Sequence, residues 1–256
     1  MTAGAPGRRT VLVTLCTYNE RENIEKLISA IHVHAPDADI LVLDDNSPDG
    51  TANFARELAL RDQRVGVLVR EARLGLGTAI VTALRYGVDH GYEFVVNMDS
   101  DFSHDPRYVP DLRAAMARVD VAVASRYIPG GRIEGWGLSR HFSSRAVNWY
   151  ARLLLGLKTR DNSGSFRCYR TASLRKVDFD RVRARGYAIQ EELLYRLKQV
   201  GCRFEEVPIV FAKRRYGRSK MGFGEAPGAL WVIFRLWIDR LMRVPVAVAD
   251  GPPLED

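Results

Sequence analysis

The chain has few cysteines and lacks a long apolar run. Its three cysteines, Cys16, Cys168 and Cys202, lie too far apart for the spacing of a metal site. An odd number of cysteines, with no signal peptide, excludes a disulfide framework and favours a reducing, cytosolic compartment. No run approaches the ~18 apolar residues of a membrane-spanning helix, and the first residues carry no apolar signal region. We therefore expect any membrane contact to be peripheral.

Basic residues are scarce in the first half of the chain and abundant in the second. Residues 1–125 hold 13 Lys and Arg against 18 Asp and Glu, whereas residues 126–256 hold 25 against 13. A basic half can serve nucleic acid, an anionic membrane or a phosphorylated substrate, or it can be a solvated surface. Composition does not choose among these. With 46% hydrophobic residues, the 256-residue chain has enough apolar material for a substantial core.

Strand-like and helix-like segments alternate through the first half. A β-rich run at 11–15 is followed by a helical pattern over 20–33, whose isoleucines and leucine recur on one face. We expect further strands at 40–43, 65–69, 94–98 and 121–124, and further helices near 51–60, 75–89 and 108–118. This order predicts an α/β fold with a wound, parallel sheet.

Acid-containing loops follow three of these strands. They are 17–20, 44–49 and the Asp-x-Asp segment 99–101. Parallel strands end at one edge of such a sheet, and ligands bind there. Alternate strand residues point to the same face, so Asp99 and Asp101 can converge on one hard cation that holds a diphosphate. The alternative for each loop is ordinary turn chemistry, because Asn, Asp, Ser and Pro are the usual turn residues.

Nine short blocks of sequence carry a family resemblance. They are TYNEREN (17–23), DDNSPDGT (44–51), LGLGTA (74–79), MDSDFSH (98–104), SRY (125–127), SGSFRCYR (163–170), GYAIQEE (186–192), VPI (207–209) and RRYGRSK (214–220). In this order and spacing, over about residues 9–243, the chain resembles the dolichol- and polyprenol-phosphate mannosyltransferases of the family 2 GT-A glycosyltransferases. It departs from their pattern at Cys16, Asn46 and Ser100, where Pro, Gly and Ala are common. None of these changes removes a charged ligand.

The resemblance implies a GT-A fold, which is a Rossmann-like and mostly parallel wound sheet followed by C-terminal amphipathic helices. It also implies roles for particular residues. Donor binding falls to Thr17, Tyr18, Asn19, Glu20, Asp45, Asp49, Gly77, Asp99, Ser100, Asp101 and Lys220. Acceptor-phosphate binding falls to Arg126, Arg140, Arg214 and Ser219, and the catalytic residues are Asp101, Arg126 and Arg214. Ser165, Gln190 and Glu192 are further candidates.

A divalent cation, Mg²⁺ or Mn²⁺, is the expected cofactor. Asp99 and Asp101 are its expected ligands, with Ser103 or a water molecule as the third. The metal neutralises the leaving diphosphate. A phosphate monoester acceptor is already ionised near neutral pH, so it needs positioning by arginines more than it needs a strong general base. For Glu20 and Asp49, helix capping and turn formation are the alternatives to donor binding.

Residues 1–8 and 244–256 are expected to be flexible or disordered tails, on either side of a catalytic domain at 9–224 and an amphipathic helix at 225–243. The donor half spans about 9–126 and the acceptor half about 127–224. The Gly-containing segment 216–224 is expected to close over the diphosphate or to link to the last helix. Aromatic and leucine residues alternate with arginines over 142–157 and 230–241, a pattern of either sheet packing or contact with a membrane or partner.

The expected function is transfer of mannose, with inversion, from GDP-mannose to a polyprenyl monophosphate at the cytoplasmic face of a membrane. Lipid phosphate, the membrane surface and a possible anchoring protein are then the partners, and nucleic acid is not. The alternatives are a related transferase that uses UDP-glucose or another sugar nucleotide, and a non-catalytic subunit that binds nucleotide or lipid.

Overall fold

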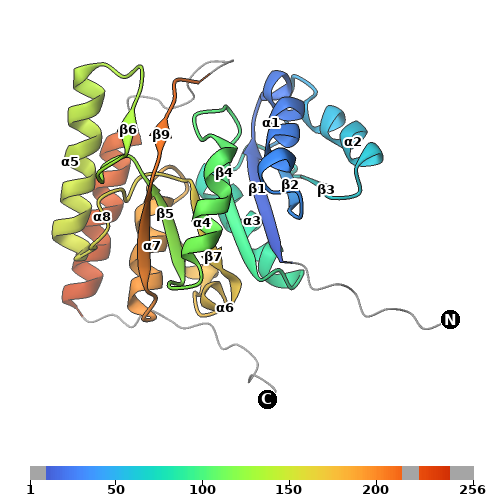
Figure 1. Ribbon diagram of the computed structural model, residues 1–256. Coiled ribbons are helices and arrows are strands. Elements are labelled where there is room, and N and C mark those ends of the chain that lie inside the picture. Colours follow the sequence, from blue (N-terminus) through green and yellow to red (C-terminus); the bar gives the residue numbers. More distant parts are fainter. Residues whose placement is uncertain (1–9, 215–224, 243–256) are drawn as a thin grey trace.

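A seven-stranded sheet organises the residues that the computed structural model describes, 10–214 and 225–242 (Figure 1). Six of its strands run in the same direction, and one strand runs antiparallel to its two neighbours. In spatial order the strands are β3 (Val65–Val69), β2 (Asp39–Asp44), β1 (Val11–Thr17), β4 (Phe94–Asp99), β7 (Arg167–Arg170), β5 (Val121–Ser125) and β8 (Phe204–Pro208).

Each central strand is buried on both faces, which explains its nearly continuous apolar sequence. In β1, Val11, Val13 and Leu15 point into one core and Leu12 points into the other. The pairing register aligns Cys16 of β1 with Asp99 of β4 and Leu43 of β2. The loops after these three strands therefore start from the same level of the sheet.

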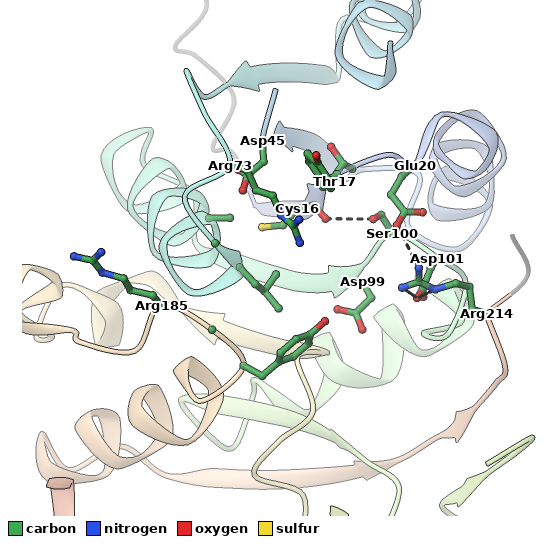
Figure 2. Close-up of a pocket in the computed structure, with 16 residues that line it drawn as sticks. Cys16, Thr17, Glu20, Asp45, Arg73, Asp99, Ser100, Asp101, Arg185 and Arg214 are labelled. Carbon is green, nitrogen blue, oxygen red and sulfur yellow. Dashed lines mark hydrogen bonds and ion pairs between the residues drawn. The ribbon is translucent and has the colours of Figure 1, made fainter. Parts of the chain in front are cut away.

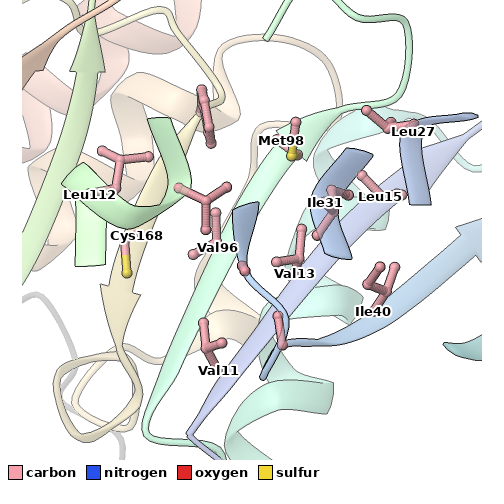
Figure 3. Close-up of a cluster of buried hydrophobic side chains, with 14 of the residues drawn as sticks. Val11, Val13, Leu15, Leu27, Ile31, Ile40, Val96, Met98, Leu112 and Cys168 are labelled. Atoms are coloured by element: carbon pink, nitrogen blue, oxygen red, sulfur yellow. The ribbon is translucent and has the colours of Figure 1, made fainter. Parts of the chain in front are cut away.

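Helices cover both faces of the sheet. The core on one face joins β1 to α1 (Arg21–His34), α2 (Thr51–Arg61) and α4 (Val109–Ala115). Figure 3 shows Leu27 and Ile31 of α1 in the same cluster as Val13 and Leu15 of β1. The core on the other face contains α3 (Leu76–Asp89), α6 (Thr171–Leu174) and α7 (Ile189–Gln199). The result is the three-layer α/β architecture that the sequence predicts.

The predicted strands and helices of the first half are confirmed to within a few residues, with one shorter helix. The helix expected near 108–118 consists of a 3₁₀ turn, Pro106–Tyr108, followed by α4, because Pro106 and Pro110 fit only at the start of a helix. Two strands of the sheet, β7 and β8, were not predicted. β8 pairs in parallel with β5, whereas β7 inserts antiparallel between β4 and β5, so the sheet is mostly rather than wholly parallel.

The second half adds a small parallel pair, β6 (Arg132–Ile133) and β9 (Val210–Phe211), and two long helices, α5 (Leu138–Leu155) and α8 (Glu225–Leu241). A short 3₁₀ turn, Phe179–Arg181, precedes α7. Both long helices bury one side in the second core, through Ala151 and Leu155 of α5 and Ile233 and Leu236 of α8. In the described part of the chain, no helix has the length and apolar character needed to cross a membrane. The predicted tails and the segment 216–224 lie outside the described residues.

Candidate active site

A cavity of ≈340 Å³ opens at the carboxyl edge of the sheet, where β1, β2 and β4 end (Figure 2). The structure brings together here many of the residues predicted from separate blocks. These are Thr17, Tyr18, Glu20, Asp45, Asp99, Ser100, Asp101 and Arg214. The parallel register explains the convergence, because three loops leave the sheet side by side.

Asp99 is held by groups from two other segments. Its Oδ1 accepts a hydrogen bond of 2.5 Å from the Ser165 hydroxyl, so this further candidate lies beside the predicted metal ligand. The backbone N–H of Asp99 donates to Nδ1 of His104 at 3.0 Å. Burial lowers the pKa of His104, and a ring nitrogen that accepts a hydrogen bond belongs to the neutral imidazole. The 3.7 Å approach of His104 to the Asp99 carboxylate is therefore not an ion pair.

Asp101 forms an ion pair with Arg214 in the cavity. Arg214 approaches its Oδ2 through Nε at 2.8 Å and through a terminal nitrogen at 2.7 Å, and lies 3.9 Å from Glu20. The Ser103 backbone N–H donates to Oδ1 at 2.9 Å. Burial by itself would raise the pKa of Asp101, but the Ser103 N–H and the Arg214 charge outweigh it, so the pKa lies below its usual value. Asp101 is ionised at neutral pH.

Ser103 takes a different place from the one predicted for it. It is 4% exposed and does not line the cavity, and its backbone N–H supports Asp101 from behind. The third metal ligand, Ser103 or a water molecule, stays a prediction.

One side of the cavity is built on β2 and the turn before α3. Asp45 is 6% exposed and pairs with Arg70, whose Nε lies 2.5 Å from Oδ1. Arg70 also donates to the Gly75 carbonyl and to the Thr78 hydroxyl, which fixes the turn that carries Arg73. The Arg73 guanidinium lies 4.4 Å from the centre of the Tyr18 ring, a cation–π contact. A flat aromatic surface with a cation and a carboxylate beside it suits a nucleoside.

Gly77 acts through packing and does not line the cavity. A Cβ atom on this residue would lie 2.3 Å from the Ala184 carbonyl oxygen, and its N–H donates to the Arg185 carbonyl at 2.7 Å. This close approach sets the position of Arg185, Gly186 and Tyr187, which do line the cavity. Gly77 is therefore a positioning residue for the opposite wall.

Glu192 supports the same wall from the other side. It is fully buried, its carboxylate accepts from the backbone N–H groups of Arg183 and Ala184, and it pairs with Arg196 at 2.7 Å. Gln190 is 1% exposed, lies outside the cavity lining, and its side-chain amide has no hydrogen-bond partner among the described residues. Neither residue reaches the cavity.

Two donor-loop residues have local structural roles. Asp49 accepts from the Thr51 N–H and hydroxyl and from the Arg21 N–H, so it joins the starts of α1 and α2. Asn19 adopts a positive φ of 56°, and its backbone N–H donates to the Ser47 hydroxyl at 2.9 Å. It does not line the cavity. These contacts agree with the turn-forming alternative for Asp49, and its role in donor binding stays a prediction.

Arg126 is buried in a bidentate pair and is absent from the cavity lining. Its Nε and a terminal nitrogen each lie 2.7 Å from Asp161, and the same terminal nitrogen donates to Ser163. Burial lowers the pKa of Arg126, but Asp161 more than reverses this, so the pKa is raised. A phosphate would have to compete with Asp161 for this guanidinium. In this structure Arg126 is paired with Asp161 outside the cavity lining, and its predicted role in binding the acceptor phosphate stays a prediction.

Arg140 lies over the Trp136 ring at 4.0 Å, and Arg126 lies 5.5 Å from the same ring. Burial, and then the charges of Arg126 and Arg214, lower the pKa of Arg140. The charges of Arg126 and Arg214 therefore both act on Arg140, although among these three predicted arginines only Arg214 lines the cavity. Ser219 and Lys220 lie outside the described residues.

Sequence comparison identifies the family once this geometry is known. The family model for glycosyl transferase family 2 matches residues 12–179. The chain belongs to glycosyl transferase family 2. It is 39% identical over 214 residues to an undecaprenyl-phosphate mannosyltransferase of Micrococcus luteus, covering 84% of this chain and 88% of the relative. It is 42% identical over 218 residues to a polyprenol monophosphomannose synthase of Mycolicibacterium smegmatis, covering 84% and 82%.

Solved structures confirm the GT-A fold of this family 2 enzyme. Glucosyl-3-phosphoglycerate synthase of Mycobacterium tuberculosis, crystallised with Mn²⁺, UDP-glucose and phosphoglyceric acid, superimposes with a TM-score of 0.63 and 19% identity. The match covers 93% of this chain and 81% of that one. Family membership and these relatives make the chain a glycosyltransferase, and they exclude the non-catalytic alternative.

The residues at the mouth of β4 fit a divalent cation. Asp99 and Asp101 supply only carboxylate oxygens, which Mg²⁺ and Mn²⁺ prefer, and the Arg214 guanidinium already stands beside Asp101 as a cation. No set of three or more His, Cys, Asp or Glu side chains suited to a metal occurs in the described ranges. In nucleotide-binding sites, such ions are usually bound by one or two carboxylates, and water and the phosphates fill the remaining coordination positions.

Several cavity residues were not predicted. Arg73, Arg185 and Tyr187 line the cavity, while Trp136 and Phe211 lie outside its lining and contact Arg126. Arg73 immediately precedes the block at 74–79, and Tyr187 lies inside the block at 186–192, so both had a signal in the sequence. Cys16 also lines the cavity, and burial raises the pKa of its thiol to about 12, so it is a neutral group there.

Proposed function

We propose that this glycosyltransferase moves mannose from GDP-mannose to a polyprenyl monophosphate, with inversion at C1 and with the help of a divalent cation. The observation that carries the proposal is the pairing, in one cavity, of the Asp99–Asp101 carboxylates with Arg214. A carboxylate pair suits a metal and a leaving diphosphate, and an arginine suits a phosphate acceptor.

The two curated relatives support the choice of substrates. Both are named for mannosyl transfer involving a prenyl phosphate, and each matches more than four-fifths of this chain. The resemblance in the sequence blocks supports GDP-mannose as the donor. UDP-glucose remains the competing donor to be tested, because the GT-A neighbour that binds it shares the fold.

The donor would bind with its nucleoside between Tyr18, Arg73 and Asp45 and its diphosphate toward Asp99 and Asp101. The ionised acceptor oxygen attacks C1 of the sugar, a new C1–O bond forms, and the bond from C1 to the diphosphate oxygen breaks. The nucleoside diphosphate leaves with the bonding electrons, and one displacement inverts C1. A bound Mg²⁺ or Mn²⁺ supplies charge stabilisation for that leaving group.

Arg214 and Arg140 have the tasks of holding and orienting the acceptor phosphate. Guanidinium groups are always charged, so they bind the phosphate without taking its proton. Arg126 and Asp161 would keep the aromatic surroundings of these arginines in place, through the contacts of Arg126 with Trp136 and Phe211. Lys220 and Ser219 stay proposals for closing the site over the diphosphate.

The acceptor's long chain would require a membrane surface, and we place the enzyme at the cytoplasmic face, where nucleotide sugars are found. Exposed apolar residues on α5 and α8 support this location. Trp149 is 63% exposed and Trp231 is also 63% exposed. A separate anchoring protein is the other way to reach the bilayer, and flotation of the chain expressed alone with vesicles separates the two.

The test is a transfer assay with a panel of donors. Purified enzyme receives radiolabelled GDP-mannose, UDP-glucose or UDP-N-acetylglucosamine, a short-chain polyprenyl phosphate, and Mg²⁺ or Mn²⁺. Label from GDP-mannose is expected in the organic phase, and addition of EDTA is expected to stop its transfer. Label arriving only from another donor would overturn the donor assignment.

A pair of variants tests the site itself. Asp101→Asn is expected to reduce turnover by at least about 100-fold, because the diphosphate loses its metal-held charge partner. Asp111→Asn, on the exposed side of α4, is the matched control and is expected to transfer normally. Equal turnover by the two variants would contradict the proposed metal site.

A further inference from the structure

A second hollow lies on α5, separate from the candidate active site. It has a volume of ≈180 Å³ and is lined by Tyr127, Arg145, Asn148, Trp149, Arg152 and Arg160. We call it the α5 pocket. No residue is shared between its lining and that of the cavity at the sheet edge.

Three arginines line the α5 pocket, and none of their guanidinium groups has an ion-pair partner among the described residues, although the Arg160 backbone N–H donates to the Glu206 carboxylate at 2.8 Å. Arg145 and Arg152 are two turns apart on α5, with Asn148 and Trp149 between them on the same face, and Arg160 comes from the segment that follows the helix. All three are exposed. The Arg145 guanidinium lies 5.8 Å from the centre of the Tyr127 ring. Like charges gathered in this way repel one another until an anion binds.

The floor of the α5 pocket is ordered by hydrogen bonds. Asn148 is 3% exposed, its Oδ1 accepts from the backbone N–H groups of Asn162 and Ser163, and its Nδ2 donates to the Ser144 carbonyl. The Tyr127 hydroxyl donates to the Ser144 hydroxyl at 2.7 Å. The pocket therefore has a fixed polar floor under a basic rim. A site with this construction needs little reorganisation to bind an anion.

An exposed apolar stripe runs along α5 beside these arginines. Leu138, Phe142 and Leu153 are 89%, 77% and 61% exposed, and Trp149 lies between them. At about 100° per residue, the stripe and the two helical arginines fall within one third of the helix circumference, with the arginines along one edge. α8 packs against α5 and exposes Trp231 as well. Apolar side chains flanked by arginines suit the boundary between acyl chains and headgroups.

We propose that the α5 pocket binds the phosphate of an anionic bilayer lipid while the apolar stripe of α5 enters the headgroup region. The proposal rests on the proposed function only in placing the enzyme at a membrane. The bound lipid is a structural lipid of the bilayer and is not the acceptor, because the arginines of the pocket are distinct from Arg140 and Arg214. Charge complementarity selects this occupant: three unpaired guanidinium groups match a phosphodiester, which they bind through paired N–H donors.

The lipid site would also orient the enzyme. Arg140, near the first turn of α5, shares the electrostatic neighbourhood of Arg214, whereas Arg152 lies 12 residues further along the helix. At about 1.5 Å per residue, the two positions are about 18 Å apart along the helix axis. A headgroup held at Arg152 and a stripe inserted along the helix would therefore lay α5 on the bilayer, with the acceptor arginines at its other end.

The test compares binding to vesicles of two compositions. Full-length enzyme is sedimented with phosphatidylcholine vesicles, with and without phosphatidylglycerol. The wild type is expected to prefer the phosphatidylglycerol vesicles, and the triple variant Arg145→Gln, Arg152→Gln, Arg160→Gln is expected to bind them about 100-fold more weakly. Unchanged binding by the triple variant would overturn the proposal.

A matched variant controls for loss of net charge. Arg56→Gln, Arg61→Gln, Lys176→Gln removes the same three charges from exposed positions away from the α5 pocket, and α2 lies at the opposite end of the molecule from α5 (Figure 1). It is expected to bind within about threefold of the wild type. If both triple variants lost the same amount of binding to phosphatidylglycerol vesicles, net charge alone would explain the effect and the proposed site would be wrong.

Two further arms separate the sources of phosphate and the two proposals. If inorganic phosphate binds the wild type but not the pocket variant, and the wild type shows no preference for phosphatidylglycerol, the site serves a soluble anion and the lipid proposal is wrong. Transfer to short-chain polyprenyl phosphate in detergent is expected to be unchanged in the pocket variant. Absence of transfer in the wild type would remove the proposed function and leave the vesicle result standing.

Discussion

At the scale of single residues, the contact between Arg214 and Asp101 links the two halves of the site. Both residues were predicted, one as an acceptor arginine and the other as a metal ligand, but their pairing was not. A cation that binds Asp101 must compete with the guanidinium. Arg214 would then be released toward the acceptor when the metal and donor arrive.

Arg214→Ala is expected to strengthen binding of Mn²⁺ to the enzyme without substrate, by about tenfold or more, because a charge-assisted pair no longer competes. Isothermal titration calorimetry measures this directly. Arg185→Ala, which removes a charge from another part of the cavity lining, is the control and is expected to change the affinity less. Weaker Mn²⁺ binding by Arg214→Ala would show that the metal and the arginine do not compete.

The ion pair of Arg126 with Asp161 could not be predicted from the sequence. An arginine directly after a strand, in a basic half of the chain, was a reasonable candidate for phosphate binding. Asp161 lies 35 positions away and belongs to no distinctive motif, yet its carboxylate accepts hydrogen bonds from both Nε and a terminal nitrogen of Arg126. Breaking a buried pair of this kind leaves an uncompensated charge, so both residues are needed whatever the substrate.

At the scale of elements, the close approach of α3 to the segment 184–187 builds one wall of the cavity. The contact needs a residue without a side chain at Gly77, because the Ala184 carbonyl lies where a Cβ atom would be. Glu192 of α7 holds the same segment from the other side through two backbone N–H groups. The first turns of two helices, α3 and α7, thus cooperate to place the segment that carries Tyr187.

Gly77→Ala is expected to raise the KM for the donor by about tenfold and to lower the melting temperature by several degrees, because the 184–187 backbone must move. Steady-state kinetics and calorimetry measure the two effects. Gly228→Ala in α8 is the control: a Cβ atom there meets no atom within 4 Å, and alanine favours a helix. A donor KM unchanged in Gly77→Ala would show that this wall does not contact the donor.

At the scale of the whole molecule, the free energy of unfolding depends on pH through a buried carboxyl group, that of Glu191. Glu191 is 2% exposed, and burial raises its pKa to about 7. The folded state keeps this proton at pH values where the unfolded chain, with an ordinary glutamate, has released it. The folded state therefore binds more protons between about pH 4.5 and 7, and the contribution of Glu191 to the free energy of unfolding falls as the pH rises through that range.

Glu191→Gln is expected to remove this dependence. Relative to the wild type, the variant should gain up to roughly 3 kcal/mol in free energy of unfolding between pH 4.5 and pH 8, because its amide does not ionise. Urea denaturation at several pH values measures the difference. Glu57→Gln on the exposed surface of α2 is the control, and parallel stability curves for Glu191→Gln and the wild type would contradict the prediction.

The sequence by itself determined the order of strands and helices, the loops that carry polar residues, and the family. These follow from local periodicity and from short blocks, which neighbouring residues encode. Only the tertiary structure decided that β7 inserts antiparallel and that three arginines line one pocket on α5. It also decided that Asp161 forms an ion pair with Arg126 and that the Ala184 carbonyl packs closely against Gly77. Those contacts join segments distant in the sequence, and their partners are chosen by packing and charge once the chain has folded.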